Sequence, residues 1–285
     1  MNLREPIHLG SGEPVLLLHP FMMSQNVWKD VAPQLAGVDV ANPSAPATGR
    51  YEVLAPTMPG HNGGVKGRFF LDTAELADDM ERRMDALGWD TAHVVGNSLG
   101  GWVAFELERR GRARSLTAIA PAGGWHRWSL PKYEIVFKFV MGFPVWLTAK
   151  ALGPRAARLP GARAAASVPV SATPDGISDA DMLDIIDDVT HCAAYYQLLV
   201  KALLLPGLME LADTRIPTHM VICEKDRVLP HPRFVNHFRK HLPESTRFTA
   251  LDGVGHIPMF EAPGRIADLI RDFLDEQIDG QRTTG

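Results

Sequence analysis

The chain has 285 residues, of which 46% are apolar and 22% are charged, and its formal net charge is −4. This length suits one large domain or a core with an insertion, and the composition excludes a disordered or repetitive protein. The mild negative charge gives no electrostatic argument for a nucleic acid or an anionic membrane as partner.

Four short apolar runs alternate with amphipathic stretches in the first half of the chain. The runs predict strands at 15–18, 52–55, 92–96 and 116–120, and the stretches predict helices at 27–35, 73–87 and 99–110. Continuous apolar runs are typical of strands buried on both faces. Alternation of strand and helix predicts a mostly parallel, doubly wound α/β sheet.

The alternation stops between Gly123 and Asp213, where no strand is predicted. Helical stretches fill this region, at 131–152, 156–166, 179–188 and 191–205. Strands then return at 219–223 and 246–251, with helices at 232–242 and 263–278. We therefore expect an α/β core of residues 1–122 and 214–285 and an inserted all-helical cap, or lid, of residues 123–213.

Other features bear on location and cofactors. Cys192 and Cys223 lie in unrelated segments without metal-ligand spacing, which indicates reduced, buried thiols, and no metal site is predicted. The N-terminus lacks a signal-peptide pattern, and the apolar run 135–152 is interrupted by Lys138 and Pro144. We expect a cytoplasmic protein without stable membrane insertion, either a monomer or a homodimer.

A nucleophile-elbow pattern stands at the end of the third predicted strand, in Gly96-Asn97-Ser98-Leu99-Gly100. A tight strand-to-helix turn exposes the Ser98 hydroxyl, which is a weak nucleophile unless a base takes its proton. Small residues are needed beside it because a Cβ would collide with the strand and the helix. On its own this pattern also fits a glycine-rich loop without chemistry.

A candidate acid and a candidate base follow two later strands. Asp226 comes after the strand ending at Cys223, and His256 comes after the strand ending at Leu251. The order serine, acid, histidine is the one found for a triad on such a sheet, where strand carboxyl ends form the site. His256 would take the Ser98 proton and Asp226 would orient the imidazole. Glu224 remains a competitor for the acid.

Two backbone N–H groups are needed to stabilise an oxyanion. Leu99, directly after the nucleophile, is the expected first donor. The second is expected from the loop after the first core strand, at Phe21, with Met22 as the fallback. His19 in the same loop is interpreted as a structural residue.

These motifs resemble the α/β-hydrolase superfamily of serine hydrolases. The matching pieces are Leu16-Leu17-Leu18-His19-Pro20-Phe21, Pro59-Gly60-His61, Gly96-Asn97-Ser98-Leu99-Gly100-Gly101, Asp226 before Pro230, and Gly255-His256-Ile257-Pro258-Met259-Phe260-Glu261. The resemblance implies an eight-stranded sheet, a cap between the sixth and seventh strands, a Ser98–Asp226–His256 triad and ester hydrolysis without a cofactor. Members commonly have glycine where Pro20 stands, which leaves the second oxyanion donor open.

The resemblance also orders the possible reactions. A serine nucleophile excludes the aspartate-nucleophile branches, the haloalkane dehalogenases and epoxide hydrolases. Carbon–carbon hydrolases of ring-cleavage products share a Gly-Asn-Ser elbow but typically have tryptophan where Ile257 stands. The chain looks more like carboxylesterases and monoacylglycerol-lipase-like members. A non-catalytic binding protein on this fold is the third alternative.

The expected substrate is a small apolar or aromatic ester. The residues expected in its pocket are Met22, Trp125, Trp128 and Ile257, from the loops at the strand ends and the start of the cap. The aromatic residues of the cap also fit simple packing of cap on core.

Overall fold

A single seven-stranded sheet runs through the computed structural model, which describes residues 3–39, 41–42, 47–68, 71–173, 175–208 and 210–284. Its strands are β1 (Ile7–Gly10), β2 (Glu13–Leu18), β3 (Tyr51–Ala55), β4 (Ala92–Asn97), β5 (Ala113–Ile119), β6 (Thr218–Cys223) and β7 (Arg247–Leu251). Their order is β1-β3-β2-β4-β5-β6-β7, and every pair except β1–β3 is parallel. The predicted α/β class is confirmed.

The six predicted strands are present with ends within three residues of those expected. The described residues contain one further strand, β1, and seven strands instead of the eight that the resemblance implied. β1 was not predicted because its four residues are alternately half-buried and exposed. Such a short edge strand lacks the apolar run that marks the central strands.

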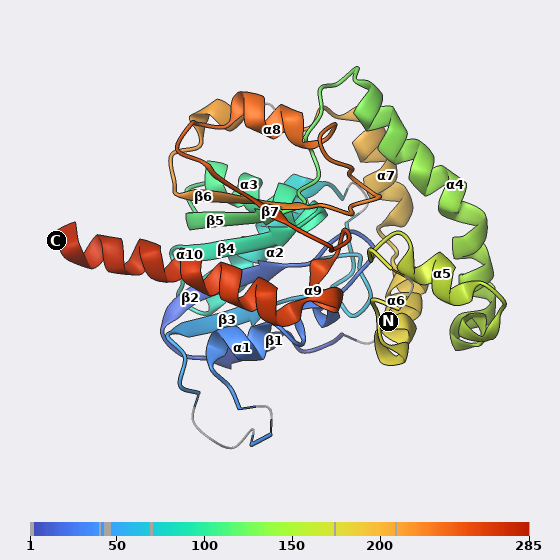
Figure 1. The fold of residues 1–285 in the computed structure, drawn as a ribbon, viewed down its shortest axis with the longest axis horizontal. Coiled ribbons are helices and arrows are strands. Elements are labelled where there is room, and N and C mark those ends of the chain that lie inside the picture. Colours follow the sequence, from blue (N-terminus) through green and yellow to red (C-terminus); the bar gives the residue numbers. More distant parts are fainter. Residues whose placement is uncertain are drawn as a thin grey trace.

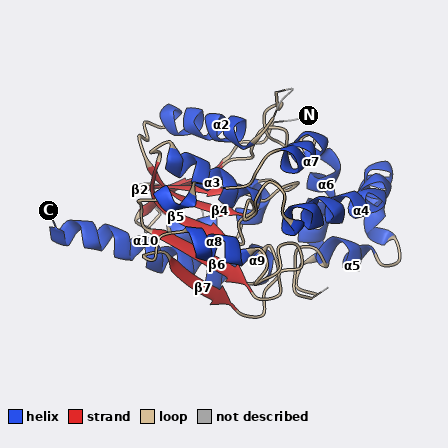
Figure 2. Cartoon of the chain, turned by 90° about the horizontal axis from the view of Figure 1, so that it is seen from above, coloured by secondary structure: helices blue, strands red, loops and turns tan. Residues whose placement is uncertain are grey.

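Helices cover both faces of the sheet (Figures 1 and 2). The helices are α1 (Ala32–Ala36), α2 (Thr73–Ala86), α3 (Leu99–Arg109), α8 (Val235–His241), α9 (Pro258–Glu261) and α10 (Pro263–Thr284), with 3-10 turns η1 (Gln25–Trp28) and η3 (Leu211–Asp213). Strand β2 shows the two cores most simply. Val15 and Leu17 pack with α1 and α10, whereas Leu16 and Leu18 pack with α2 and α3.

Between β5 and β6 the chain leaves the sheet and forms only helices in its described part. These are α4 (Leu130–Leu152), η2 (Gly153–Arg158), α5 (Ala162–Ser167), α6 (Asp179–His191) and α7 (Tyr195–Leu204), and we call residues 130–204 the helical segment. β5 and β6 are hydrogen-bonded neighbours, so the segment departs from and returns to adjacent strands. It lies on one side of the sheet (Figure 1).

Polar contacts join α6 to the core. The carboxylate of Asp188, which is almost fully buried, accepts hydrogen bonds from Arg4 Nη1 (3.1 Å), Ser24 Oγ (2.6 Å) and Asn62 Nδ2 (3.0 Å). Burial outweighs these partners and raises the pKa of Asp188 to about 6. α6 is thus attached to the core partly through a buried charge, which is a costly arrangement unless the charge is well solvated by donors.

Candidate active site

The turn between β4 and α3 has a strained serine at its tip. Ser98 has φ 54° and ψ −113°, and α3 begins at the next residue. A Cβ on Gly96 would lie 2.2 Å from the Gly100 carbonyl oxygen, and a Cβ on Gly100 would lie 2.2 Å from the Leu18 carbonyl oxygen. Only glycine fits at either position, so the two glycines permit the backbone to hold Ser98 in this conformation.

The acid and the histidine lie in contact beyond the ends of β6 and β7. His256 Nδ1 is 2.7 Å from Asp226 Oδ2, and both side chains are at least 95% buried. Because a carboxylate accepts here, Nδ1 carries the hydrogen and Nε2 has the free lone pair. The second oxygen of Asp226 accepts the backbone N–H groups of Val228 and Leu229, each at 2.8 Å, which fixes the carboxylate in place.

Glu224, the competitor for the acid, makes different contacts. Its carboxylate accepts the backbone N–H of Gly253 at 2.8 Å and pairs with Lys225, and the side chain is 44% exposed. Glu224 therefore supports the loop before His256 from outside, and Asp226 is the carboxylate that contacts the imidazole.

Asn97 connects the elbow to the histidine loop. Its buried side-chain amide donates to the carbonyl oxygens of Ile119 at 2.9 Å and His256 at 3.1 Å. Asn97 was not among the predicted site residues, although an amide next to the candidate nucleophile at a buried strand end was a usable signal. Neither Ser98 Oγ nor His256 Nε2 hydrogen-bonds another described residue, and such contacts often form only when substrate binds.

The expected second oxyanion donor, Phe21, and its fallback, Met22, differ in their position relative to Ser98. Phe21 and Leu99 line the same cavity as Ser98, whereas Met22 does not. Among the described residues, the N–H groups of Phe21 and Leu99 donate to no protein acceptor. Free N–H groups beside Ser98 are what an oxyanion needs, so this position favours Phe21 over Met22.

His19 has no ring nitrogen left for proton transfer. Nδ1 donates to the Pro20 carbonyl oxygen at 2.9 Å, and Nε2 accepts the Met58 N–H at 2.9 Å. Burial, followed by the neighbouring His61 imidazole, holds the pKa of His19 well below its ordinary value. His19 ties its loop to the turn after β3 and keeps Phe21 in position.

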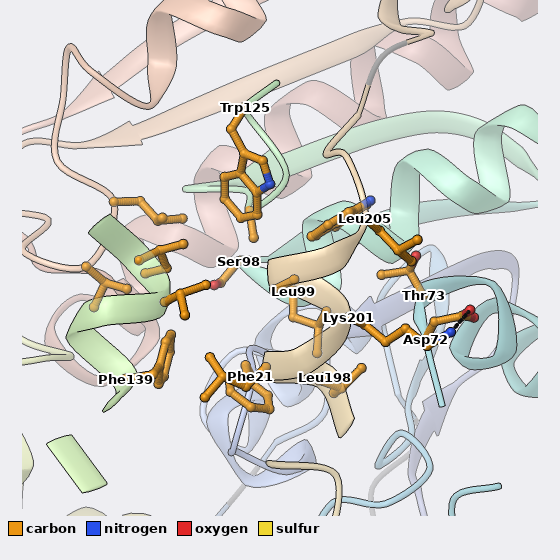
Figure 3. Close-up of a pocket in the computed structure, with 18 residues that line it drawn as sticks. Phe21, Asp72, Thr73, Ser98, Leu99, Trp125, Phe139, Leu198, Lys201 and Leu205 are labelled. Carbon is orange, nitrogen blue, oxygen red and sulfur yellow. Dashed lines mark hydrogen bonds and ion pairs between the residues drawn. The ribbon is translucent and has the colours of Figure 1, made fainter. Parts of the chain in front are cut away.

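A cavity of about 80 Å³ lies in front of Ser98 (Figure 3). Its walls come from the loops at the strand ends and from the helical segment. The loop side contributes Phe21, Leu99 and Trp125, and the helices contribute Phe139 of α4, Leu198 of α7 and Leu205 directly after α7. The lining is almost wholly apolar. An ion pair between Lys201 Nζ and Asp72 Oδ2, at 3.3 Å, forms the polar part of the wall.

Of the four residues expected in the pocket, Trp125 lines this cavity and three do not. Trp128 is 80% exposed, with the Arg127 guanidinium 5.6 Å from its ring. Ile257 and Met22 are buried in the two hydrophobic cores. The expectation failed because adjacent residues in a loop point in different directions, which composition cannot resolve. α4 and α7 supply the residues that were missed.

Comparison with known proteins shows the family of this chain. The model of the alpha/beta hydrolase family matches residues 15–269. The chain belongs to this family. This hydrolase is 61% identical over 206 residues to "Epoxide hydrolase EphH" of Mycobacterium tuberculosis. The alignment covers 72% of this chain and 96% of that protein.

Solved structures share the hydrolase's fold. An esterase from Thermogutta terrifontis superposes with a TM-score of 0.70 at 20% identity, covering 96% of this chain and 93% of the other. The epoxide hydrolase CorEH has a TM-score of 0.70 at 21% identity, covering 94% and 93%. At these identities the likeness concerns the fold alone. The two neighbours differ in their named chemistry, so the reaction of this hydrolase must be argued from its own side chains.

Proposed function

We propose that this hydrolase cleaves carboxylic esters, or closely related acyl compounds, through an acyl-Ser98 intermediate. The observation that carries the proposal is the buried 2.7 Å contact between His256 Nδ1 and Asp226, because it leaves His256 Nε2 free to act as the base. The loop that carries His256 is itself tied to the elbow through the Asn97 amide. A strained serine at the elbow and an imidazole with one free nitrogen form the combination that nucleophilic acyl transfer requires.

In the first half-reaction, Ser98 Oγ forms a bond to the substrate carbonyl carbon as its proton passes to His256 Nε2. The carbonyl π electrons move to oxygen, and the N–H groups of Leu99 and Phe21 stabilise that oxyanion, each contributing on the order of 3 kcal/mol. When the intermediate collapses, the bond to the alcohol oxygen breaks and His256 returns the proton to it. Water then repeats the sequence on the acyl-serine and releases the acid.

Asp226 acts through the imidazole. The hydrogen bond from Nδ1 keeps the tautomer in which Nε2 accepts a proton, and the carboxylate stabilises the imidazolium formed in each half-reaction. We further propose that the helical segment is a cap over the site, because α4 and α7 supply much of the apolar cavity wall. An apolar wall suits a small apolar or aromatic substrate.

The similarity to a protein named as an epoxide hydrolase makes epoxide opening the second candidate. Attack of a serine hydroxyl on an epoxide carbon would give an ether, which has no carbonyl for water to attack, so the enzyme would stay alkylated. A carboxylate nucleophile instead gives an ester, which water can cleave. Ser98 at the elbow therefore favours acyl transfer, and epoxide hydrolysis would need direct attack by water. Carbon–carbon hydrolysis with the same three residues remains a further alternative.

The experiment is an activity comparison of the wild type with Ser98→Ala, using p-nitrophenyl esters, an aromatic epoxide and a fluorophosphonate probe. We expect a burst of p-nitrophenol and covalent labelling in the wild type, and neither in the variant. Epoxide turnover that survives Ser98→Ala, without ester turnover in the wild type, would overturn the proposal. Labelling without ester turnover would point to the carbon–carbon reaction.

A further inference from the structure

Three histidines gather where α8 meets the loop after β5. His126 lies in that loop, and His237 and His241 lie one turn apart on α8. One ring nitrogen of each lies within 4.8 Å of those of the other two, and the ring centroids are 4.5–5.5 Å apart. None of the three lines the cavity in front of Ser98, and the proposed reaction does not use them.

Backbone carbonyl groups fix the tautomers of two of these rings. His237 Nε2 lies 2.7 Å from the Leu208 carbonyl oxygen, and His241 Nδ1 lies 2.8 Å from the His237 carbonyl oxygen. A carbonyl can only accept, so each of these nitrogens carries the hydrogen. His237 Nδ1 and His241 Nε2 are left with lone pairs. Metal-ligating histidines are typically oriented in this way, with the non-ligating N–H on a carbonyl or carboxylate.

The loop and the helix are held close by more than the histidines. A Cβ on Gly124 would lie 2.5 Å from the Phe238 ring and 2.7 Å from the Phe234 carbonyl oxygen, so the loop backbone packs directly on α8. Leu208, whose carbonyl orients His237, donates its own N–H to the Gly123 carbonyl at 2.8 Å. The site is therefore built on a backbone that is fixed on two sides.

We infer that His126, His237 and His241 form a site for one divalent transition-metal ion of the Zn²⁺ type. Three imidazoles suit such ions, and Zn–N bonds of about 2.1 Å in tetrahedral geometry place the nitrogens about 3.4 Å apart. Rotation of the exposed His126 ring brings its nitrogen toward the other two. A water molecule would take the fourth position. The ion would link α8 to the loop that carries Trp125, a wall residue of the cavity.

The test is titration of the chelator-treated full chain with Zn²⁺ by calorimetry and with Co²⁺ by visible absorption. We expect one site per chain, a tetrahedral Co²⁺ spectrum, and a rise in Tm with Zn²⁺. His126→Ala, an exposed position whose loss leaves the fold intact, should weaken Zn²⁺ binding at least tenfold. His191→Ala, at another exposed histidine, is the matched control and should bind like the wild type.

Equal Zn²⁺ affinity in the wild type and His126→Ala would overturn the inference, as would the absence of a stoichiometric site in the wild type. Labelling of Ser98 by the fluorophosphonate is measured in parallel, because it reports on the hydrolase site alone. Failure of the metal site is thereby distinguished from failure of the proposed acyl chemistry.

A second inference rests on a separate observation, the outer surface of α4. Tyr133, Phe137, Met141 and Val145 follow one another at helical spacing and are 40–63% exposed. α4 and the following 3-10 turn are long and apolar enough, by length and composition, to cross a bilayer, yet only 11% of the apolar window is buried. The opposite side of the helix, with Phe139, lines the cavity. We call the exposed side of α4 the outer stripe.

Charge around the outer stripe differs in sign from the rest of the chain. Residues 123–173 contain seven lysines or arginines and one glutamate, a net charge of +6, whereas the whole chain carries −4. Lys132 is the one buried cation among them. At one end of the outer stripe the exposed Trp128 has the Arg127 guanidinium 5.6 Å from its ring, and at the other end Lys150 lies 4.6 Å from the ring of the buried Trp146. The overall charge, which gave no argument for an anionic membrane, conceals this basic segment.

We propose that the outer stripe lies on the surface of a bilayer that contains anionic lipids. An apolar helix face flanked by basic side chains and an exposed tryptophan, here Trp128, binds such a surface without spanning it. A second copy of the chain is a poorer occupant, because a twofold interface would place one +6 segment against another. This proposal does not depend on the reaction at Ser98.

The test is co-sedimentation with phosphatidylcholine vesicles, with and without phosphatidylglycerol. We expect binding only to the anionic vesicles, weakened by salt, and reduced at least tenfold in the double variant Phe137→Ser and Met141→Ser. Leu183→Ser, at an exposed leucine on α6, is the matched control and should bind like the wild type. Absence of binding, or full binding by the double variant, would overturn the proposal. A dimer in light scattering that only the double variant loses would do so as well.

Discussion

The strand ends around Ser98 and the helical segment both border the cavity, but they are stabilised in different ways. Every residue of β4 is buried, whereas α4 buries only Lys132, Ile135 and Trp146 among its 23 residues. Apolar packing holds the elbow, and polar contacts such as those of Asp188 help to hold the helical segment. The proposed chemistry is therefore placed on the closely packed region, and much of the cavity wall lies on the more loosely packed one.

The largest expected effect is the loss of kcat when Asp226, on the closely packed side of the site, is changed. Asp226→Asn should lower kcat on esters by about 10⁴-fold, because the imidazole loses the partner that fixes its tautomer. Glu224→Gln, which changes a carboxylate two residues away, should keep kcat within a few-fold of the wild type. Steady-state kinetics of the two variants on one ester checks the ranking. A greater loss in Glu224→Gln would reverse our assignment of the acid.

Two glycine substitutions test the packing difference itself. Gly100→Ala should destabilise the fold by about 3 kcal/mol, since its Cβ would meet the backbone of Leu18. Gly142→Ala in α4 has no atom within 4 Å of the new Cβ and should stabilise by up to about 1 kcal/mol through helix propensity. Urea unfolding measures both. Equal destabilisation by the two would show that α4 is as closely packed as the elbow.

The pH dependence of stability tests the buried charge that joins α6 to the core. The pKa of Asp188 is about 6 in the folded chain and 3.8 ordinarily, so between these values the folded chain holds a proton that the unfolded chain has released. Its contribution to the free energy of unfolding therefore falls as pH rises from about 4 to about 6, by about 3 kcal/mol in total.

Asp188→Asn removes this dependence. As pH rises from about 4 to about 6, the free energy of unfolding of the variant should therefore increase relative to that of the wild type. Asp187→Asn, which also loses a carboxylate beside Arg4 and Asn62, is the control for loss of polar contacts. A difference between Asp188→Asn and wild type that stays constant from pH 4 to 6 would contradict the assignment.

The smallest expected effect lies in the cavity wall. Phe139→Ala should enlarge the cavity and raise kcat/KM for longer acyl chains relative to short ones by about tenfold, the scale of one or two methylene contacts. Phe137→Ala on the same helix points outward, with 63% exposure, and should leave the preference unchanged. An acyl-length series of p-nitrophenyl esters measures this. Equal shifts in both variants would remove α4 from the specificity wall.

The sequence was most informative where one residue type had a single role. Val15 to Leu18 form the continuous apolar run that is typical of a strand buried on both faces, and the glycines around Ser98 favour a tight turn. The order of Ser98, Asp226 and His256 along alternating strands then placed them at one edge of the sheet. The same logic missed β1, whose short, half-exposed sequence resembles a loop.

The cavity wall could not be predicted in the same way. Trp125 and Trp128 are three residues apart in one loop, yet one is buried in the wall and the other is exposed to solvent. Which side of α4 faces inward depends on how it packs against α6 and α7, and this tertiary information is absent from composition. The position of Asn97 beside Ser98 was a usable signal, but its partners are the backbone carbonyls of Ile119 and His256, which the sequence does not identify.

The Glu261 carboxylate connects the loop of His256 to the helical segment. One of its oxygens accepts the N–H of Gly255, next to His256, and the other accepts Ala172 N–H and Ser171 Oγ from the stretch between α5 and α6. Val170 also accepts the N–H of Ile257 at 2.8 Å. Displacement of that stretch would break hydrogen bonds on both sides of His256. The position of the helical segment and the alignment of the imidazole are therefore coupled, and a ligand that changes one also changes the other.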